Sequence, residues 1–391
     1  MGDAPVKAHI DYRTFYSTSN TLKLLKKPII LIDGFDPQNA RKIEACDCQA
    51  DIKCRDANSK NGLFDANYES IVYSMQYFNP ILGGPDNVLD NLRNKGFDVI
   101  IVDQPSYDYT NNGVTTKVDG GADYIERNAM ALVSLIKSVN NKVASNGSTE
   151  KLVLLGPSMG GLISRYALAF MEKKFAETNI ASWQHNTRLW VSIDSPHLGA
   201  NVPLGDQGLF NLVRGDNVKA REFYEEKLRS PAAQEMLIEQ HREGASYNTV
   251  NPNYLNAQIS SQGMTSNTGN PYFVQHFNNH ASNGLPNSNG FPMNLRKIAL
   301  VNGSLTGSKN TVDVLGNQTQ PFANDGQAII SLRGFQRLRL QIPFTNIGVN
   351  LDTLIAVLET YNMPTNGTYA RITRYKKGFD DRTTSAPNVN V

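Results

Sequence analysis

The feature that most constrains the fold is a glycine-rich segment placed between two apolar patterns, within residues 151–170. Residues 151–155 (KLVLL) are a short apolar run, which predicts a buried strand. The run leads directly into Gly-Pro-Ser-Met-Gly-Gly at 156–161, and the apolar residues that follow recur at helical spacing. A buried strand that turns sharply into a helix is the repeating unit of α/β sheets. The segment therefore predicts a parallel sheet with crossover helices.

Four further apolar runs have the length and composition of buried strands. They are residues 28–33 (PIILID), 97–103 (FDVIIVD), 188–194 (RLWVSID) and 295–301 (LRKIALV). Helical patterns lie between them, at residues 85–95 and 122–143 and after residue 161. Alternating strands and helices predict a doubly wound, mostly parallel sheet, so the expected fold class is α/β.

The length of the chain allows one large core with insertions. We expect an N-terminal flank at 1–27, a core at 28–205 and 295–375, an insertion at 206–294 and a disordered tail at 376–391. An insertion of this size after a strand is commonly a lid or a binding loop. Within the insertion we predict a helix at 217–242. Beyond the last core strand we predict a strand at 336–343, a helix at 351–361 and a strand at 368–375.

The charge balance and the lengths of the apolar runs give no reason to expect a nucleic-acid or membrane partner. The chain has 38 basic and 36 acidic residues, a net charge of +2, so nothing indicates a nucleic acid or an anionic membrane as partner. No apolar run approaches the roughly 20 residues that span a bilayer, and we expect no transmembrane segment. A neutral or mixed substrate fits this balance. The sequence predicts no oligomeric state.

The first three residues lack the basic and apolar regions of a signal peptide. The chain is therefore either cytoplasmic, or secreted or periplasmic with its leader removed, and we favour the second. Cys46, Cys48 and Cys54 share one polar stretch, where at most one internal disulfide can form. We interpret this stretch as a surface loop, because a zinc knuckle would lack an obvious fourth ligand.

The turn at residues 156–160 has the pattern G-x-S-x-G, with Ser158 at its centre. In a strand-to-helix turn of this kind the serine is held in a strained backbone conformation, and the flanking glycines let the turn close without clashes. The serine hydroxyl then projects above the sheet, where the N-terminus of the following helix favours a developing negative charge. We predict that Ser158 is a nucleophile; the alternative is a plain glycine-rich turn.

Three stretches resemble the lipase and esterase branch of the α/β-hydrolase superfamily. They are IILIDGFDP at 29–37, GPSMGGLISRYAL at 156–168 and SIDSPHLGAN at 192–201. The second is the most specific, since Ser-Met-Gly-Gly followed by Arg-Tyr recurs in lipases and in membrane-lipid deacylases. The resemblance spans about residues 28–305. It implies a Ser-His-acid hydrolase that cleaves a small-molecule or polymeric ester and needs neither a metal nor an organic cofactor.

Acyl transfer also needs two backbone N–H donors for the oxyanion. The residue after the nucleophile, Met159, supplies the first. The loop at 33–37 (DGFDP) stands where similar lipases have a His-Gly-x loop, so the resemblance makes Phe35 the second donor. An ordinary glycine turn is the alternative interpretation of this loop.

The general base is the main departure from the family pattern. In this superfamily the triad histidine follows the last core strand, but the last histidine here is His280, which precedes the strand at 295–301. We therefore expect the base to lie beyond Val391, which would make the chain a truncated hydrolase. His197 is one alternative base, although in similar lipases the histidine of this segment only helps to shape the site. His276 is the other, if it moves into the site from the insertion.

The other histidines are weaker candidates. His241 is interpreted as a solvated residue of a helix. His276 and His280 are spaced i, i+4, which on a helix would suit a metal ion. Pro271 and the asparagine-rich surroundings instead predict a loop, so we expect no metal site there.

The acid of the triad is also ambiguous. After the strand at 295–301 the sequence reads Asn-Gly-Ser and has no carboxylate until Asp313. Asp194 ends the preceding strand, a position that some lipases use for the acid. We favour Asp194, with Asp313 and Asp325 as alternatives. The non-catalytic interpretation of Asp194 is a carboxylate that caps the loop after the strand.

Three classes of function stay open on this sequence. We favour a carboxylic ester hydrolase that acts through an acyl-enzyme on Ser158. An acyltransferase or peptidase would use the same nucleophile, and a catalytically silent binding protein with this fold would use none. A fluorophosphonate probe separates the first two classes from the third.

Overall fold

The computed structural model describes residues 7–39, 88–200 and 270–301, together with residues 202, 207, 210, 214–215 and 217–238. For the strands at 259–260, 263–264, 328–341, 348–361, 373–377 and 389–390 it gives the path of the backbone. The chain divides into two compact units. Unit 1 is Met1–His197 with Phe277–Asn302, and unit 2 is Leu198–His276 with Gly303–Val391.

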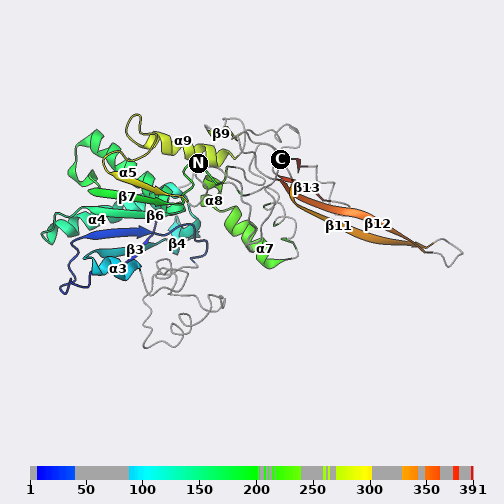
Figure 1. Cartoon of the computed structure of the whole chain (residues 1–391), viewed down its shortest axis with the longest axis horizontal. Helices are drawn as coiled ribbons and strands as arrows, with labels where there is room; N and C mark the ends of the chain where they lie inside the picture. Colours follow the sequence, from blue (N-terminus) through cyan, green and yellow to red (C-terminus); the bar gives the residue numbers. More distant parts are fainter. Residues whose placement is uncertain are drawn as a thin grey trace, which may run out of the picture. The chain divides into compact units, whose positions relative to one another are not determined.

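Unit 1 is built on a six-stranded sheet in which five strands run parallel and β1 pairs antiparallel with β3 (Figure 1). The order is β1 (Asp11–Phe15), β3 (Asp98–Asp103), β2 (Pro28–Ile32), β6 (Leu152–Pro157), β7 (Thr187–Ile193) and β10 (Arg296–Leu300). Every residue of β2 and β3 is buried, as expected for parallel strands covered on both faces. The carboxyl ends of the five parallel strands meet at one edge of the sheet.

Three helices cover these strands: α3 (Val88–Asn94), α4 (Ile125–Ser145) and α5 (Met159–Thr178). Leu89 of α3 packs against Leu31 and Ile101 on one face of the sheet. Neighbouring strand residues such as Ile30 point to the opposite face, because side chains alternate along a strand. Helices α4 and α5 pack against each other. No helix in the described part of the chain is both long and apolar enough to cross a bilayer.

The predicted α/β fold with a mostly parallel sheet is confirmed. All five predicted core strands are present, and their ends lie within two residues of the predicted ones. The sequence analysis missed β1 and the hairpin formed by β4 (Ser106–Asn111) and β5 (Val114–Asp119). β1 and β5 are largely exposed and β4 is mostly half-buried. None of the three has a continuous apolar run, so the pattern that predicts a buried strand is absent from them.

Unit 2 contains α7 (Val218–Glu222), a π-helical segment at Phe223–Leu228 and α8 (Pro231–Met236). The single helix predicted at 217–242 is therefore wrong: the chain starts a new helix at Pro231, where the Ser230 hydroxyl caps the Ala233 N–H at 3.2 Å. A short hairpin pairs β8 (Ile259–Ser260) with β9 (Gly263–Met264). A four-stranded antiparallel sheet has the order β11 (Ala328–Gln341), β12 (Gly348–Tyr361), β13 (Thr373–Lys377) and β14 (Val389–Asn390).

The structure differs from three predictions for the C-terminal part. The helix predicted at 351–361 is the long strand β12, because β11 pairs with it along its whole length. The pattern LDTLIAVLETY fits both periods, and strand pairing decides between them. The tail expected to be disordered from residue 376 contains the end of β13 and all of β14. Residues 303–375, expected in the core, belong to unit 2.

The loop predicted around His276 and His280 is also wrong, because both lie in α9 (Pro271–Asn283). Proline is favoured at the first helical position, where its missing N–H costs nothing. The Asn270 side chain accepts a hydrogen bond from the Tyr272 N–H at 3.0 Å and so caps the helix. The boundary between the two units falls inside α9, after His276.

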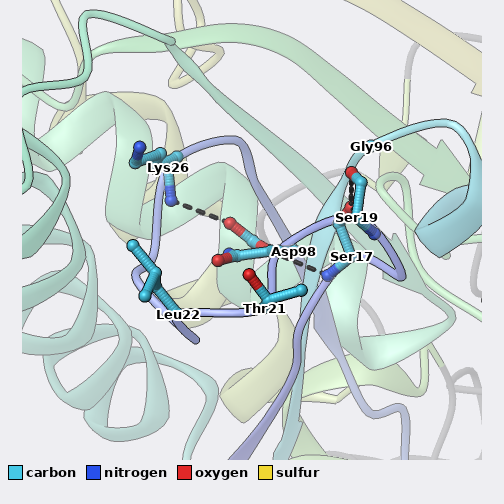
Figure 2. Close-up of a pocket in the computed structure, with 8 residues that line it drawn as sticks. Ser17, Ser19, Thr21, Leu22, Lys26, Gly96 and Asp98 are labelled. Carbon is cyan, nitrogen blue, oxygen red and sulfur yellow. Dashed lines mark hydrogen bonds between the residues drawn. The ribbon is translucent and has the colours of Figure 1, made fainter.

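A pocket of about 240 Å³ lies at the amino end of β3, beside Asp98 (Figure 2). This carboxylate is buried and accepts hydrogen bonds from the backbone N–H groups of Ser17 and Lys26 and from the Asn20 amide, among others. Its oxygens are thus engaged in holding the segment after β1. The pocket is lined by Ser17, Ser19, Asn20, Thr21, Leu22, Lys26, Gly96 and Asp98. It lies at the edge of the sheet opposite to Ser158.

Candidate active site at the carboxyl edge of the sheet

Ser158 lies in the sharp turn between β6 and α5 and has a left-handed backbone, with φ of 50° and ψ of −125°. A side chain other than glycine rarely adopts such a conformation, which persists only when the surroundings fix it. Here two hydrogen bonds do so. The Ser158 N–H donates to the Ile193 carbonyl at 2.8 Å, and its own carbonyl accepts from the Gly161 N–H at 3.0 Å.

The glycines on either side of Ser158 are required by close backbone contacts. A Cβ atom on Gly156 would collide with the Gly160 carbonyl, and one on Gly160 would lie 2.6 Å from the Asp33 carbonyl oxygen. Neither position can therefore accept a side chain without moving the main chain. The G-x-S-x-G pattern follows from this packing.

The loop after β2 lies directly beside the serine. A Cβ atom on Gly34 would be 3.2 Å from the Ser158 Cβ atom. The loop is held at Asp36, whose N–H donates to the Gly121 carbonyl at 2.9 Å. Phe35 lies between these two fixed residues, and Met159 follows the serine as the first, fully buried residue of α5. Of the two residues predicted as oxyanion donors, Met159 thus follows Ser158 in the chain, and Phe35 follows Gly34, the residue that lies beside Ser158.

Three carboxylates gather at the same edge, after β2 and at the end of β3. Oxygens of Asp33, Asp36 and Asp103 all lie within 4.8 Å of one another. Burial, followed by the charges of Asp33, Asp36 and Asp11, raises the pKa of Asp103 to about 7. The group could share a proton near neutral pH or hold a hard cation, which prefers carboxylate oxygens. The sequence carried a signal for it, because both predicted strands end in aspartate.

Asp194, the predicted acid, directly follows β7. This strand is the neighbour of β6, which leads into Ser158. It has φ of 47°, and its N–H donates to the Leu300 carbonyl at 2.7 Å. It lies at the carboxyl edge of the sheet, and it is exposed. The alternatives Asp313 and Asp325 lie outside the described residues.

His197, a predicted alternative base, contacts side chains of β7 and of the segment before β10. Its Nε2 lies 2.8 Å from the Ser192 hydroxyl, and its ring meets Trp190 and Phe291 with centroids 5.7 and 5.5 Å apart. Burial, followed by the nearby charge of Arg165, lowers the pKa of His197 to about 4. The imidazole is therefore neutral at physiological pH. Its ring contacts within the described part of the chain do not include Ser158.

The remaining candidates are placed as follows. His276 lies in the part of α9 that belongs to unit 2, with its Nδ1 3.9 Å from a Glu235 oxygen. His280, in unit 1, is buried against the Tyr166 ring at 5.1 Å. His241 and the three cysteines lie outside the described residues.

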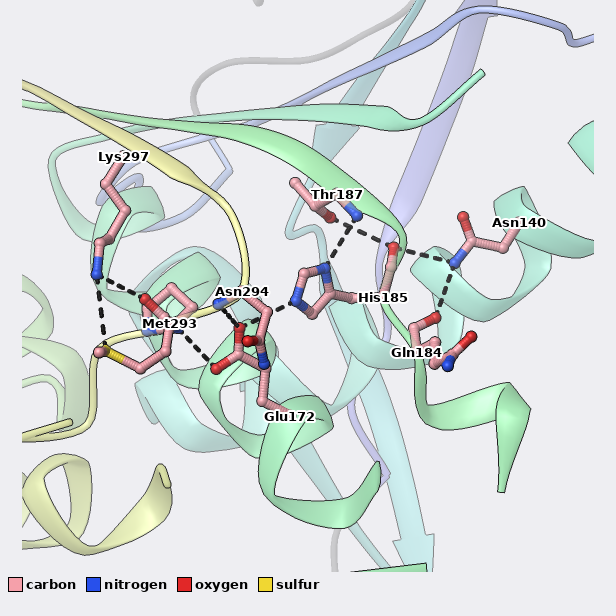
Figure 3. A network of polar contacts seen from close by, with 9 residues as sticks. Asn140, Glu172, Gln184, His185, Thr187, Met293, Asn294 and Lys297 are labelled. Atoms are coloured by element: carbon pink, nitrogen blue, oxygen red, sulfur yellow. Dashed lines mark hydrogen bonds and ion pairs between the residues drawn. The ribbon is translucent and has the colours of Figure 1, made fainter. Parts of the chain in front are cut away.

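A second buried network, which the sequence analysis did not find, holds the far end of α5 (Figure 3). Glu172 accepts hydrogen bonds from the N–H groups of Met293 and Asn294, each at 2.7 Å, and pairs with His185 Nε2 at 3.2 Å. The Thr187 N–H donates to His185 Nδ1 at 2.9 Å, which leaves the proton on Nε2. Burial would raise the pKa of Glu172, but these hydrogen bonds lower it. The network fixes α5 against the start of β7.

A family model described as alpha/beta hydrolase fold matches residues 81–343, more than half of the chain. Curated protein sequences give no match. The solved structures that resemble the chain include the lipase BlEst2 of Bacillus licheniformis in its propeptide form, at 14% identity and a TM-score of 0.28, with 58% of this chain and 33% of that chain covered.

Two others are esterases. Est1E from Butyrivibrio proteoclasticus with bound ferulic acid is 12% identical over 48% of this chain and 49% of its own, with a TM-score of 0.25. Esterase 2 from Thermogutta terrifontis, phosphonylated by cyclosarin, is 12% identical over 51% of this chain and 59% of its own, with a TM-score of 0.26. This chain thus spans between one third and three fifths of the length of these three structures, and at such TM-scores the likeness carries no mechanism.

Proposed function

Because this chain belongs to the α/β-hydrolase family, we propose that it is a serine hydrolase of the lipase and esterase type, with Ser158 as its nucleophile. The observation that carries the proposal is the left-handed Ser158 in a strand-to-helix turn that only glycines can flank. This geometry supports a nucleophile elbow, a turn that projects the serine hydroxyl above the sheet. The substrate class that we propose is a carboxylic ester.

In this mechanism the Ser158 oxygen attacks the ester carbonyl while a general base takes the hydroxyl proton and passes it to the departing alcohol. Water, deprotonated by the same base, then releases the acid from the acyl-enzyme and restores the Ser158 hydroxyl. Each tetrahedral intermediate carries a negative charge on the former carbonyl oxygen. We assign its stabilisation to the N–H groups of Met159 and Phe35, assisted by the N-terminal end of α5. Asp194 is our candidate for the acid that orients the base. No base is assigned within the described residues, because the His197 imidazole is engaged with Ser192.

The experiment that tests this function is ester hydrolysis by matched serine variants. We expect Ser158→Ala to lower the turnover of p-nitrophenyl acetate by about three orders of magnitude or more, because the acyl-enzyme cannot form. Ser134→Ala, at an exposed position of α4, should keep the wild-type rate. Circular dichroism checks that both variants fold. A Ser158→Ala variant with more than a tenth of the wild-type turnover would overturn the assignment.

A further inference from the structure

Arg165 of α5 is a buried cation whose described partners include no carboxylate. Its residue is 4% exposed, and burial lowers the pKa of the guanidinium to about 10. Burying a charged group is costly unless hydrogen bonds replace its water. Here three backbone carbonyls accept from it: Gly290 at 3.1 Å, Asn289 at 2.7 Å and His197 at 3.4 Å. The guanidinium carbon also lies 3.7 Å from the centre of the Phe291 ring.

These carbonyls belong to two segments that are far apart in the sequence. One is the loop after β7, which begins with Asp194 and includes His197. The other is the turn before β10, where Asn289 and Gly290 have φ of 50° and 71°. A lysine cannot make the same set of hydrogen bonds, since only the planar guanidinium presents several donors in a fixed fork.

The same face of α5 holds the loop after β7 at a second point. Gly161 lies four residues before Arg165, and a Cβ atom there would collide with the Ser195 hydroxyl. The Ser195 hydroxyl in turn donates to the Gly156 or Ile193 carbonyl, both at 3.3 Å. Residues four apart share a helix face. The loop is thus fixed on both sides of Pro196, immediately after Asp194.

We propose that Arg165 is a positioning residue, which sets the loop that carries Asp194 against the helix that begins after Ser158. The proposal rests on the proposed function, because a position of Asp194 matters only if the serine and the acid work together. Arg165 itself lies seven residues beyond the serine, about two helical turns, and its hydrogen bond to the loop is to a backbone carbonyl. Its effect should therefore be on turnover, since misplacing a catalytic group by about 1 Å can cost on the order of 100-fold.

The test compares Arg165→Met and Arg165→Lys with Arg93→Met. Arg93 is a matched control: it is a half-buried arginine whose Nε donates to the Tyr16 carbonyl at 2.8 Å, near the opposite edge of the sheet. We expect Arg165→Met to lower kcat for p-nitrophenyl acetate by about 10- to 100-fold with KM within about twofold, and Arg165→Lys to lie between it and the wild type. Arg93→Met should lower Tm and leave kcat unchanged.

Amide hydrogen exchange provides a readout that does not depend on catalysis. In Arg165→Met, residues 194–197 and 289–290 should exchange faster than in Arg93→Met. Unchanged exchange there, or a kcat no lower than that of Arg93→Met at equal Tm, would overturn the proposal. If the wild type hydrolyses no ester, the proposed function fails, and the exchange experiment alone then decides whether Arg165 positions the loop.

Discussion

Ser158 is held in a conformation that costs on the order of 1–3 kcal/mol for a residue with a side chain. Its two backbone hydrogen bonds, to Ile193 and Gly161, offset part of this cost. The flanking Gly156 and Gly160 remove the clashes that would otherwise forbid the turn. These contacts explain each fixed position of the G-x-S-x-G pattern. The backbone strain lies at Ser158, the residue whose hydroxyl the proposed chemistry uses.

Asp103 allows a prediction about pH at the same scale. Its pKa is about 7 in the folded protein, against an ordinary value of 3.8, so the folded state binds the extra proton between these two values. The free energy of unfolding should therefore fall as the pH rises from about 4 to about 7 and be constant above. At about 1.4 kcal/mol for each pH unit between the two pKa values, the loss is at most about 4 kcal/mol. Asp103→Asn should not show this loss.

The measurement is urea unfolding of the wild type and Asp103→Asn at pH 5 and pH 8. We expect the variant to gain stability relative to the wild type at pH 8 only, because the amide cannot ionise. Asp108→Asn, at an exposed position of β4, is the control and should follow the wild type at both pH values. Equal differences between Asp103→Asn and the wild type at the two pH values would contradict the raised pKa.

At the scale of elements, the Glu172 network gives a prediction for α5. Glu172→Gln keeps the size of the side chain but cannot accept from both backbone N–H groups and from His185. A buried donor left without a partner costs about 1–3 kcal/mol, so the free energy of unfolding should fall by about that amount or somewhat more. Urea unfolding at pH 7 measures it.

Glu177→Gln provides the control on the same helix. Glu177 pairs with Lys174 at the surface, where such pairs contribute little, so this variant should unfold like the wild type. If the two variants lose the same stability, the buried network does not hold α5.

The elements that the sequence predicted correctly are chiefly strands that neighbouring elements bury on both faces. Strands such as β2 and β3 are buried on both faces, which leaves a continuous apolar run in the sequence. β12 was predicted as a helix, because its apolar residues fit both periods and only the partner strand β11 decides. α9 was missed because Pro271 signals the end of a helix and the start of one equally well. A local sequence pattern is insufficient where a distant partner strand decides between helix and strand, and where a proline fits both the start and the end of a helix.

For the molecule as a whole, the parallel sheet explains why distant residues meet. Ser158, the loop containing Phe35, and Asp194 each follow the carboxyl end of a parallel strand, so the topology alone brings them to one edge. The sequence predicted these residues because each stands directly after an apolar run. It marked Arg165 only as part of the motif at 156–168 and did not reveal its role, since a buried arginine with carbonyl partners has no local pattern. The base is not assigned within the described residues.

The central claim, that Ser158 is an activated nucleophile, is tested most directly by locating a covalent adduct. The folded wild-type chain is treated with a fluorophosphonate probe, digested, and the modified residue is identified by mass spectrometry. The account predicts one adduct, on Ser158, which is absent after heat denaturation before labelling, because only the folded chain holds the hydroxyl beside the general base and the oxyanion donors that activate it. An adduct on another serine, or none on a folded chain, would contradict the account.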